Sequence, residues 1–382
     1  MAQIRRVRPH EFESAAKLAD SVFRDAEQKS MRAAYPNSFS PSLSQSYGAF
    51  VDDNIVSYVG FVPSIIKIGE ARLNVYSVGG VCTHPDQRGK GFAGAILEQL
   101  REHSVRAGAP LILVSGNRPL YERFGCRLFG ETTTFELSMA TASSIIEKQE
   151  LHDTALRPIS HTDWFGMKRL AELRAVAYEQ SLWDLANLIE AAPTTSNSKQ
   201  IHRVWVAERH GIVAAYAILA VPDGRRTPKK TPFLVEWAGD PDLAAALAAR
   251  GMMDADVSSL RCVVPSHEVR FTEVLTEAGC TGEPTKQGGT VVVVDAERLL
   301  TQLAPFLTRI NAAAFSKLRF RNQGHDTYIV EWDGISYELS ASAIISLLFD
   351  RDGVQSALGD ASHPAAALFP VPFPYTSGLN FA

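Results

Sequence analysis

The first third of the chain alternates between the apolar patterns of strands and helices. Ile4–Val7 predicts a short strand, and apolar residues at helical spacing between Pro9 and Phe23 predict a helix. Residues 30–46 are rich in Ser, Pro and Asn, which predicts a loop or a broken helix over an opening. Strand and helix signals that alternate in this way indicate a mixed α/β region.

Strand patterns dominate the next stretch. Ala49–Val51 and Val56–Val62 are separated by Asp-Asp-Asn, a sequence that favours a hairpin turn. Leu73–Thr83 predicts another strand, and a glycine-rich turn then leads into a helix over Phe92–Ala107. Gly108 stands where a glycine commonly ends a helix.

Shorter elements complete this region. Leu111–Val114 predicts a buried strand, a short helix is expected around Tyr121, and Thr132–Ser138 predicts a last strand. The polar stretch Thr141–Thr154 is expected to be a linker. Together these signals predict a first domain over residues 1–148.

The middle of the chain repeats this order faintly. The corresponding signals are Leu156–Ile159, Trp164–Glu190, Val204–Ala207, Ala214–Ala220, Phe233–Trp237, Ala244–Arg250, Leu260–Val264 and Glu268–Ala278. The similarity lies in architecture rather than in residues, which indicates an internal repeat over residues 149–289.

A third pattern occupies residues 290–382. Its strand and helix signals are Val291–Val294, Ala296–Phe306, Phe320, Thr327–Trp332, Ser336–Ser340 and Ser342–Phe349. Residues 368–375 are apolar and stiffened by prolines, so we expect this tail to dock on the body of the protein. The predicted fold class is therefore α/β and α+β, with domains at 1–148, 149–289 and 290–382.

Composition and charge narrow the class of protein. The 382 residues carry a net charge of −4, without the basic surplus of a general nucleic-acid binder, and this mild acidity fits a cationic substrate only weakly. The 4 cysteines show no metal-ligand spacing, so we expect reduced thiols and no metal site. Neither a signal peptide nor an apolar run of membrane-spanning length is apparent, which predicts a cytoplasmic protein without a membrane partner.

The segment Val81–Ala93 carries the clearest chemical signal. Its sequence, Val-Cys-Thr-His-Pro-Asp-Gln-Arg-Gly-Lys-Gly-Phe-Ala, predicts a strand that runs into a basic loop and then a helix. Gly89 and Gly91 let backbone N–H groups converge, and the helix start adds the positive end of its dipole. Arg88 and Lys90 add charge, so the loop suits a pyrophosphate; alternatively, it is a solvated turn.

This spacing, Arg-x-x-Gly-x-Ala preceded by Val-x-Thr-x-Pro, resembles the signature of the GCN5-related N-acetyltransferase (GNAT) superfamily. The resemblance implies that the loop binds the pyrophosphate of acetyl-CoA and that the preceding strand pairs with its pantetheine amides. The implied cofactor-binding residues are Val81, Cys82, Thr83, Arg88, Gly89, Lys90, Gly91, Phe92, Ala93, Gly94, Gly116 and Asn117.

The resemblance also places Tyr121 near the thioester sulfur. Pro119 suits the first turn of the short helix, and Asn117 suits its cap. When an amine attacks the acetyl carbonyl, the leaving thiolate needs a proton, and a phenol of pKa about 10 still holds one at neutral pH. Tyr121 is therefore the predicted general acid, with an oxyanion donor among the backbone N–H groups near Val81; alternatively, Tyr121 is only a packed aromatic.

Two further residues have competing interpretations. Cys82 could carry an acetyl group, but it lies in a strand without an evident His partner, so a buried spacer is favoured. Asp25 follows the first predicted helix and could hold an ammonium group, or it could be a solvated charge at the helix end.

The order of an acetyltransferase domain, a degenerate copy and a small α+β domain resembles the Enhanced intracellular survival (Eis) family. Tyr-Glu-Arg-Phe-Gly from Tyr121 is similar to that family's Tyr-Gly-Arg-Phe-Gly, and Phe23 and Asp25 have counterparts in its substrate pocket. The second region has Gly-Asp-Pro-Asp from Gly239 in place of the basic loop, which implies a copy that cannot bind CoA. The third region is similar to sterol-carrier-protein folds.

In that family the terminal carboxylate enters the active site as general base. The present sequence ends Asn-Phe-Ala at Ala382, one residue beyond the family's terminal Phe, which makes Ala382 the corresponding candidate. Substrates of relatives are amines, including amine antibiotics, and the resemblance implies a homo-oligomer. We therefore expect acetyl transfer to a cationic small molecule in a ternary complex, with a role in antibiotic resistance or self-protection.

Two other functions remain open from the sequence. The acceptor could instead be a protein or peptide amine. The chain could also be a non-catalytic acyl-CoA or lipid-binding protein, in which the third domain holds the ligand. The intact loop at Arg88–Ala93 and Tyr121 argue against a binding role, because a retired site would be free to lose them.

Overall fold

The computed structural model describes residues 2–148 and 153–382, which separate into two compact units. The first unit combines the chain up to Gly130 with Gln287–Pro374 and Ala382. The second combines Glu131–Lys286 with Tyr375–Phe381. The tail thus contributes to both units.

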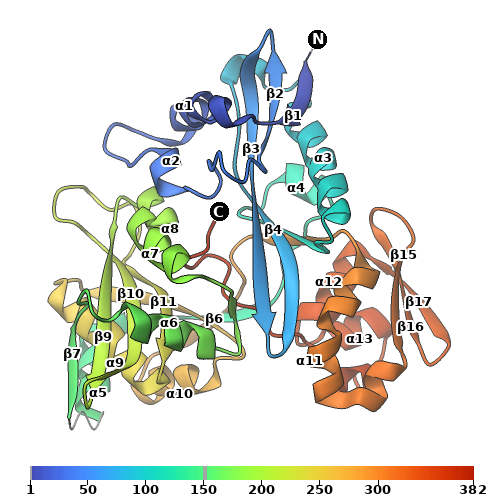
Figure 1. Cartoon of the computed structure of the whole chain (residues 1–382). Helices are drawn as coiled ribbons and strands as arrows, with labels where there is room; N and C mark the ends of the chain where they lie inside the picture. The colour runs from blue at the N-terminus through green and yellow to red at the C-terminus, as the bar shows by residue number, and fades with distance from the viewer. Residues whose placement is uncertain (1, 149–152) are drawn as a thin grey trace. The chain divides into compact units, whose positions relative to one another are not determined.

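The first unit is built on a mixed sheet in the order β1-β2-β3-β4-β5-β14. Its strands are β1 (Gln3–Arg6), β2 (Tyr47–Val51), β3 (Asn54–Ile68), β4 (Ala71–Thr83), β5 (Leu111–Val114) and β14 (Thr290–Val293). Asp52 and Asp53 form the predicted hairpin turn, both with positive φ, as tight two-residue hairpin turns require. β3 continues six residues beyond the predicted Val62, because it pairs with β4 as far as Ile68 in the long hairpin of Figure 1.

The helices of this region follow the sequence closely. They are α1 (Phe12–Phe23), α2 (Met31–Ala34), α3 (Phe92–Arg106) and α4 (Pro119–Arg123). Ser30 caps α2, and Gly108 follows the end of α3 with φ +72°, as predicted for a helix stop. Ile96, Leu97 and Leu100 bury one face of α3 against the sheet.

The sheet of the first unit is completed by a strand from much later in the chain. β14 pairs antiparallel with β5, with Thr290 opposite Val114. The predicted strand at Thr132–Ser138 exists as β6 (Glu131–Ser138), but it pairs with strands of the second unit. Edge pairing depends on three-dimensional proximity, which local sequence does not encode.

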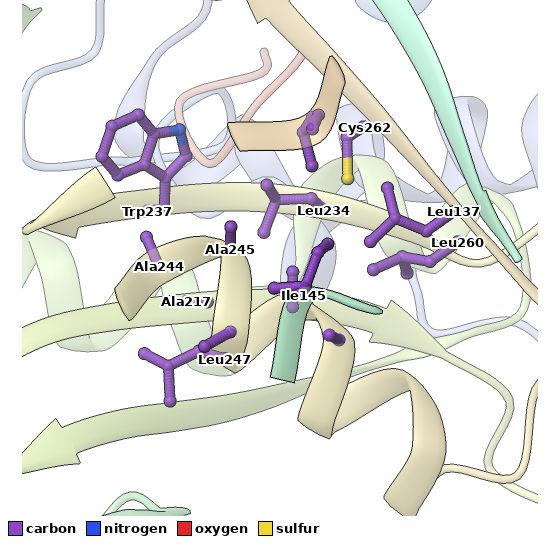
Figure 2. Packing of buried hydrophobic residues seen from close by; sticks show 14 of the residues in the cluster. Leu137, Ile145, Ala217, Leu234, Trp237, Ala244, Ala245, Leu247, Leu260 and Cys262 are labelled. Atoms are coloured by element: carbon purple, nitrogen blue, oxygen red, sulfur yellow. The ribbon is translucent and has the colours of Figure 1, made fainter. Parts of the chain in front are cut away.

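The second unit has a sheet in the order β7-β9-β10-β11-β12-β6-β13. Its other strands are β7 (Thr154–Pro158), β9 (Ile201–Arg209), β10 (Ile212–Val221), β11 (Phe233–Gly239), β12 (Ser259–Pro265) and β13 (Gly282–Lys286). The remaining elements are α5 (Met139–Lys148), α6 (Trp164–Leu173), β8 (Val176–Tyr178), α7 (Leu182–Ala191), α8 (Pro193–Asn197), α9 (Pro241–Asp254) and α10 (Val269–Glu277). Figure 2 shows part of its core, in which Ala244, Ala245 and Leu247 of α9 pack among sheet residues such as Leu234 and Leu260.

The predicted linker Thr141–Thr154 is wrong over its first half. Residues up to Lys148 form α5, and residues 149–152 of the expected linker lie outside the described part of the chain. Ser138 and Thr141 cap this helix, since each backbone N–H donates to the other's side-chain oxygen. The polar residues that suggested a linker are therefore its cap and exposed face, while Ala142 and Ile145 are buried.

The later part of the first unit holds α11 (Ala296–Ser316), a sheet of β15 (Leu318–Asn322), β16 (Thr327–Trp332) and β17 (Ile335–Ser340), then α12 (Ala341–Phe349) and α13 (Gly353–Leu358). The proline-rich tail docks here as expected. Val371 donates to the Leu348 carbonyl at 2.7 Å, and Phe373 packs edge-on against Phe129 and Phe349.

Candidate active site

Strand β4 is distorted where it passes the pair Gly79-Gly80. Tyr58 pairs with Cys82, but Gly60 pairs with Gly79, so β4 holds one more residue than β3 over this stretch. Gly80 has φ +59°, a conformation that glycine adopts without steric cost. The extra residue makes a β-bulge, which bends the strand and redirects its backbone groups.

The pairing of β4 with β5 ends beside this bulge. Parallel pairing runs from Val75 to Val78, and the last backbone bond is donated by Ser115 to the Val78 carbonyl at 3.1 Å. β4 itself continues to Thr83. Within the described residues, β5 therefore leaves Gly79–Thr83 without a partner on that edge, and this stretch includes the predicted Val81, Cys82 and Thr83. An extended ligand with amide groups could pair there.

The basic loop leads from this free edge into α3. Gly91 is the N-cap of α3 at φ +78°, and no side chain within the described part of the chain caps the helix. A Cβ at Gly89 or Gly91 would meet open space, and both glycines are exposed together with Arg88 and Lys90. The N–H groups of Phe92, Ala93 and Gly94 begin the helix, so the loop has the geometry of an anion site.

Tyr121 lies on α4 in the same hydrophobic cluster as Val81, Phe92 and Val114. Tyr121 is 7% exposed, and its hydroxyl makes no hydrogen bond within the described residues. A Cβ at Gly116 would lie 3.2 Å from the Tyr121 ring, so the glycine allows a close approach. Burial raises the pKa of Tyr121, an effect that the nearby Arg118 partly opposes, and the phenol therefore stays protonated at neutral pH.

The carboxyl group of Ala382 lies against the bulge. A Cβ at Gly79 would overlap this group, so only glycine leaves room for it. Gly60 lies opposite Gly79, and a Cβ there would be 2.8 Å from the Gly79 carbonyl oxygen. The structure thus places Ala382 beside Gly79, the first residue of β4 beyond its pairing with β5.

Cys82, Phe23 and Asp25 have different surroundings. Cys82 is 3% exposed and burial raises its pKa to about 12, which leaves the thiol protonated and unreactive at neutral pH. Phe23 ends α1 and Asp25 lies exposed in the next turn, where its carboxylate accepts from the Glu27 backbone at 3.1 Å. Neither Phe23 nor Asp25 belongs to the cluster around Tyr121.

One residue role is corrected and others were missed. Arg118, not Asn117, is the N-cap of α4, because Pro119 forces an extended conformation on the residue before it. Thr290 of β14 donates to the Gly116 carbonyl at 2.9 Å and so supports the turn beside Tyr121. Gly79-Gly80 inside a strand was the sequence signal that could have located the bulge.

Comparison with known families bears on this geometry. Residues 3–129 match the model of an acetyltransferase (GNAT) domain. These residues therefore form a GNAT acetyltransferase domain. GNAT domains use acetyl-CoA as co-substrate, and the matched span contains the bulge, the loop at α3 and Tyr121. No curated protein sequence matches the acetyltransferase.

Solved structures share the fold of the acetyltransferase over nearly its whole length. Eis1 from Mycobacterium abscessus gives a TM-score of 0.62 at 15% identity, over 99% of this chain and 100% of its own. A GCN5-related N-acetyltransferase from Anabaena variabilis gives 0.62 at 12% identity, over 99% and 98%. A probable N-acyltransferase from Enterococcus faecalis gives 0.61 at 13% identity, over 90% and 86%. The fold is therefore Eis-like.

The described residues contain no group of three or more His, Cys, Asp or Glu side chains that could hold a metal ion. None of their helices has the length and apolar character needed to cross a membrane.

Proposed function

We propose that this enzyme transfers the acetyl group of acetyl-CoA directly to a primary amine of a cationic small molecule in a ternary complex. The observation that carries the proposal is the convergence at β4. A free strand edge, an uncapped and glycine-rich helix start, and a buried tyrosine with an unbonded hydroxyl all lie along one stretch of the first unit. An amine antibiotic is a substrate of the required chemistry.

The cofactor would lie along this stretch in an extended form. The amides of pantetheine would pair with Val81–Thr83, as a further strand would. The pyrophosphate would meet the N–H groups from Gly89 to Gly94 and the charges of Arg88 and Lys90. Gly116 and Asn117 would border the thioester from the β5 side.

The transfer removes two protons from the substrate ammonium and supplies one proton to the CoA thiolate. The carboxylate of Ala382 would accept a proton from the substrate ammonium, and the free amine would then attack the acetyl carbonyl. A backbone N–H near Val81 would stabilise the oxyanion. When the carbon–sulfur bond breaks, the CoA thiolate would take a proton from Tyr121, and the second proton of the attacking nitrogen would return to the tyrosinate. Phe23 and Asp25 are proposed to contact the acceptor.

The strand directions of the two large sheets support the proposed domain organisation. The strand order β7-β9-β10-β11-β12 has the same directions as β1-β2-β3-β4-β5, three antiparallel pairings followed by one parallel pairing. We propose that the second unit holds a degenerate GNAT-like domain and that residues 290–382 form a sterol-carrier-protein-like domain. The predicted boundaries at 148 and 289, and a homo-oligomeric assembly, belong to the same proposal.

The decisive experiment compares wild type with Tyr121→Phe. CoA release is measured with acetyl-CoA and a panel of polyamine antibiotics, other amines and peptides. Loss of the general acid should lower kcat about 10²–10⁴-fold while acetyl-CoA binding, measured by calorimetry, is retained. Turnover only with peptides would move the acceptor to protein amines. Binding of acetyl-CoA without turnover on any acceptor would favour a binding protein.

The pH dependence gives a second test of Tyr121. Its pKa is raised by burial, so the protonated acid persists as pH rises beyond the ordinary tyrosine value. We expect no alkaline loss of kcat that reports an acid below about pH 10. A fall near neutral pH in wild type that disappears in Tyr121→Phe would contradict the proposal, because it would assign a lowered pKa to this group.

A further inference from the structure

The tail segment Tyr375–Phe381 belongs to the second unit, and Thr376, Gly378 and Leu379 of this segment are buried. Leu379 is 0% exposed and packs in a cluster with residues of α6, α7 and the sheet. The Asn380 side-chain oxygen accepts a hydrogen bond from Gln180 at 3.0 Å. A Cβ at Gly378 would lie 2.9 Å from the Val235 carbonyl oxygen, so the tail backbone makes a close approach to β11.

This approach occurs where β11 has the same irregularity as β4. Leu219 pairs with Leu234 and Ile218 pairs with Glu236, so Val235 is an extra residue of β11 relative to β10. In the same way, β4 has one residue more than β3 at Gly80 and Val81. Parallel pairing of β11 with β12 is confined to Phe233 and Arg261. Among the described residues, β12 pairs with no residue of β11 beyond Phe233, and Gly378 lies close to the carbonyl of the bulged Val235.

We propose that Tyr375–Phe381 occupies, in the second unit, the place that pantetheine takes beside β4, and that Leu379 is thereby a positioning residue for the Ala382 carboxyl group. Only three peptide units separate Leu379 from Ala382, and each spans about 3.8 Å between Cα atoms. A side chain fixed in a core therefore limits the range of that carboxyl group to about 11 Å. Leu379 acts as the anchor of the base. This inference rests on the proposed role of Ala382.

Ion pairs between poorly exposed side chains lie beside the tail and support the role of Leu379 as anchor. Arg174 pairs with Glu236, the residue after the bulge, and also with Glu268 at 2.8 Å. A Cβ at Gly378 would lie 3.5 Å from a Glu236 carboxylate oxygen. Arg174 holds the Glu236 carboxylate in place. Gly378 therefore packs against a fixed side chain.

The test compares Leu379→Ala with Leu185→Ala, since both leucines are 0% exposed in the same cluster. Both variants should lose thermal stability through a cavity of similar size. Only Leu379→Ala should lose kcat, by about 10²-fold, because misplacement of a reacting group by about 1 Å has that effect. KM for acetyl-CoA should not change, added imidazole should restore part of kcat, and Leu379→Met should retain most activity.

Two outcomes would overturn the anchor. Equal kcat in Leu379→Ala and wild type would do so, as would an equal loss in Leu185→Ala. If wild type is active and Tyr121→Phe is not, such a result leaves the proposed function standing. If wild type itself shows no turnover, hydrogen exchange over residues 376–382 decides: faster exchange in Leu379→Ala than in Leu185→Ala supports the anchor, and equal exchange refutes it.

Discussion

The helices that follow β4 and β11 begin in opposite ways. In the first unit, α3 starts at Gly91, with exposed basic neighbours and no side-chain cap among the described residues. In the second unit, α9 starts at Asp240, whose carboxylate accepts from the N–H groups of Asp242 and Leu243 at 2.9 and 3.2 Å. One helix start is left open to an anion, and the other is already filled by one.

The rest of each helix is consistent with this difference. α3 is amphipathic and keeps one exposed face, whereas α9 buries an unbroken run from Leu243 to Ala249. Asp242 is also held by Arg270, whose Nε lies 2.9 Å from the carboxylate. α9 is therefore a core helix whose first turn is satisfied internally. The two helices share their place after a strand, but only α3 of the two leaves its first N–H groups without a side-chain cap and so available to an anion.

The largest expected effect comes from giving α3 the acid of α9. Gly91→Asp places a carboxylate at the proposed phosphate site, and we expect acetyl-CoA to bind about 10–100-fold more weakly through like-charge repulsion. Gly91→Asn is the matched control, since it carries the same left-handed strain without charge. Calorimetry measures both dissociation constants. Equal values for Asp and Asn would show that Gly91 does not face the phosphates.

The reverse change should affect stability rather than binding. Asp240→Ala removes the cap of α9 and should cost about 1 kcal/mol in urea unfolding, while Asp240→Asn should cost little because Asn also caps helices. Acetyl-CoA stoichiometry should stay at one per chain in both, since Asp242 and the tail remain. A second equivalent bound by Asp240→Ala would show that the cap alone excludes the cofactor.

The smallest effect is expected at Cys82. Burial raises its pKa to about 12, so no thiolate is available to carry an acetyl group at neutral pH. Cys82→Ala should retain kcat, as should Cys126→Ala, whose thiol is equally buried with a pKa raised to about 12. Intact mass spectrometry should find no acetyl adduct on wild type. A selective loss of activity in Cys82→Ala with such an adduct would indicate a covalent intermediate.

The sequence predicted the elements around the site because their signals are local. Asp52 and Asp53 specify a tight turn, Gly108 ends α3, and Gly89 and Gly91 mark a loop that turns into a helix. Each of these features depends on backbone preferences within a few residues. They were sufficient to predict the loop and its helix, whereas the role of Tyr121 and the chemistry came from the resemblance to the GNAT superfamily.

Other features depend on contacts between distant segments. Thr141 belongs to the predicted linker although its side chain caps a helix, and only the burial of Ala142 and Ile145 distinguishes a helix from a linker here. The bulge at Gly79-Gly80 became visible through its pairing with β3, and its proximity to Ala382 bridges about three hundred residues of sequence.

The amino-acid sequence by itself determined the local devices of this acetyltransferase: the glycine loop, the basic charges and the tyrosine. Tertiary structure alone decided which strands complete each sheet, since β6 joins β12 while β14 joins β5. It also decided where the tail runs. The physical reason is that strand pairing and core packing depend on complementary surfaces from segments that are distant in the sequence. Turns, caps and loops depend instead on residues that are close in the sequence.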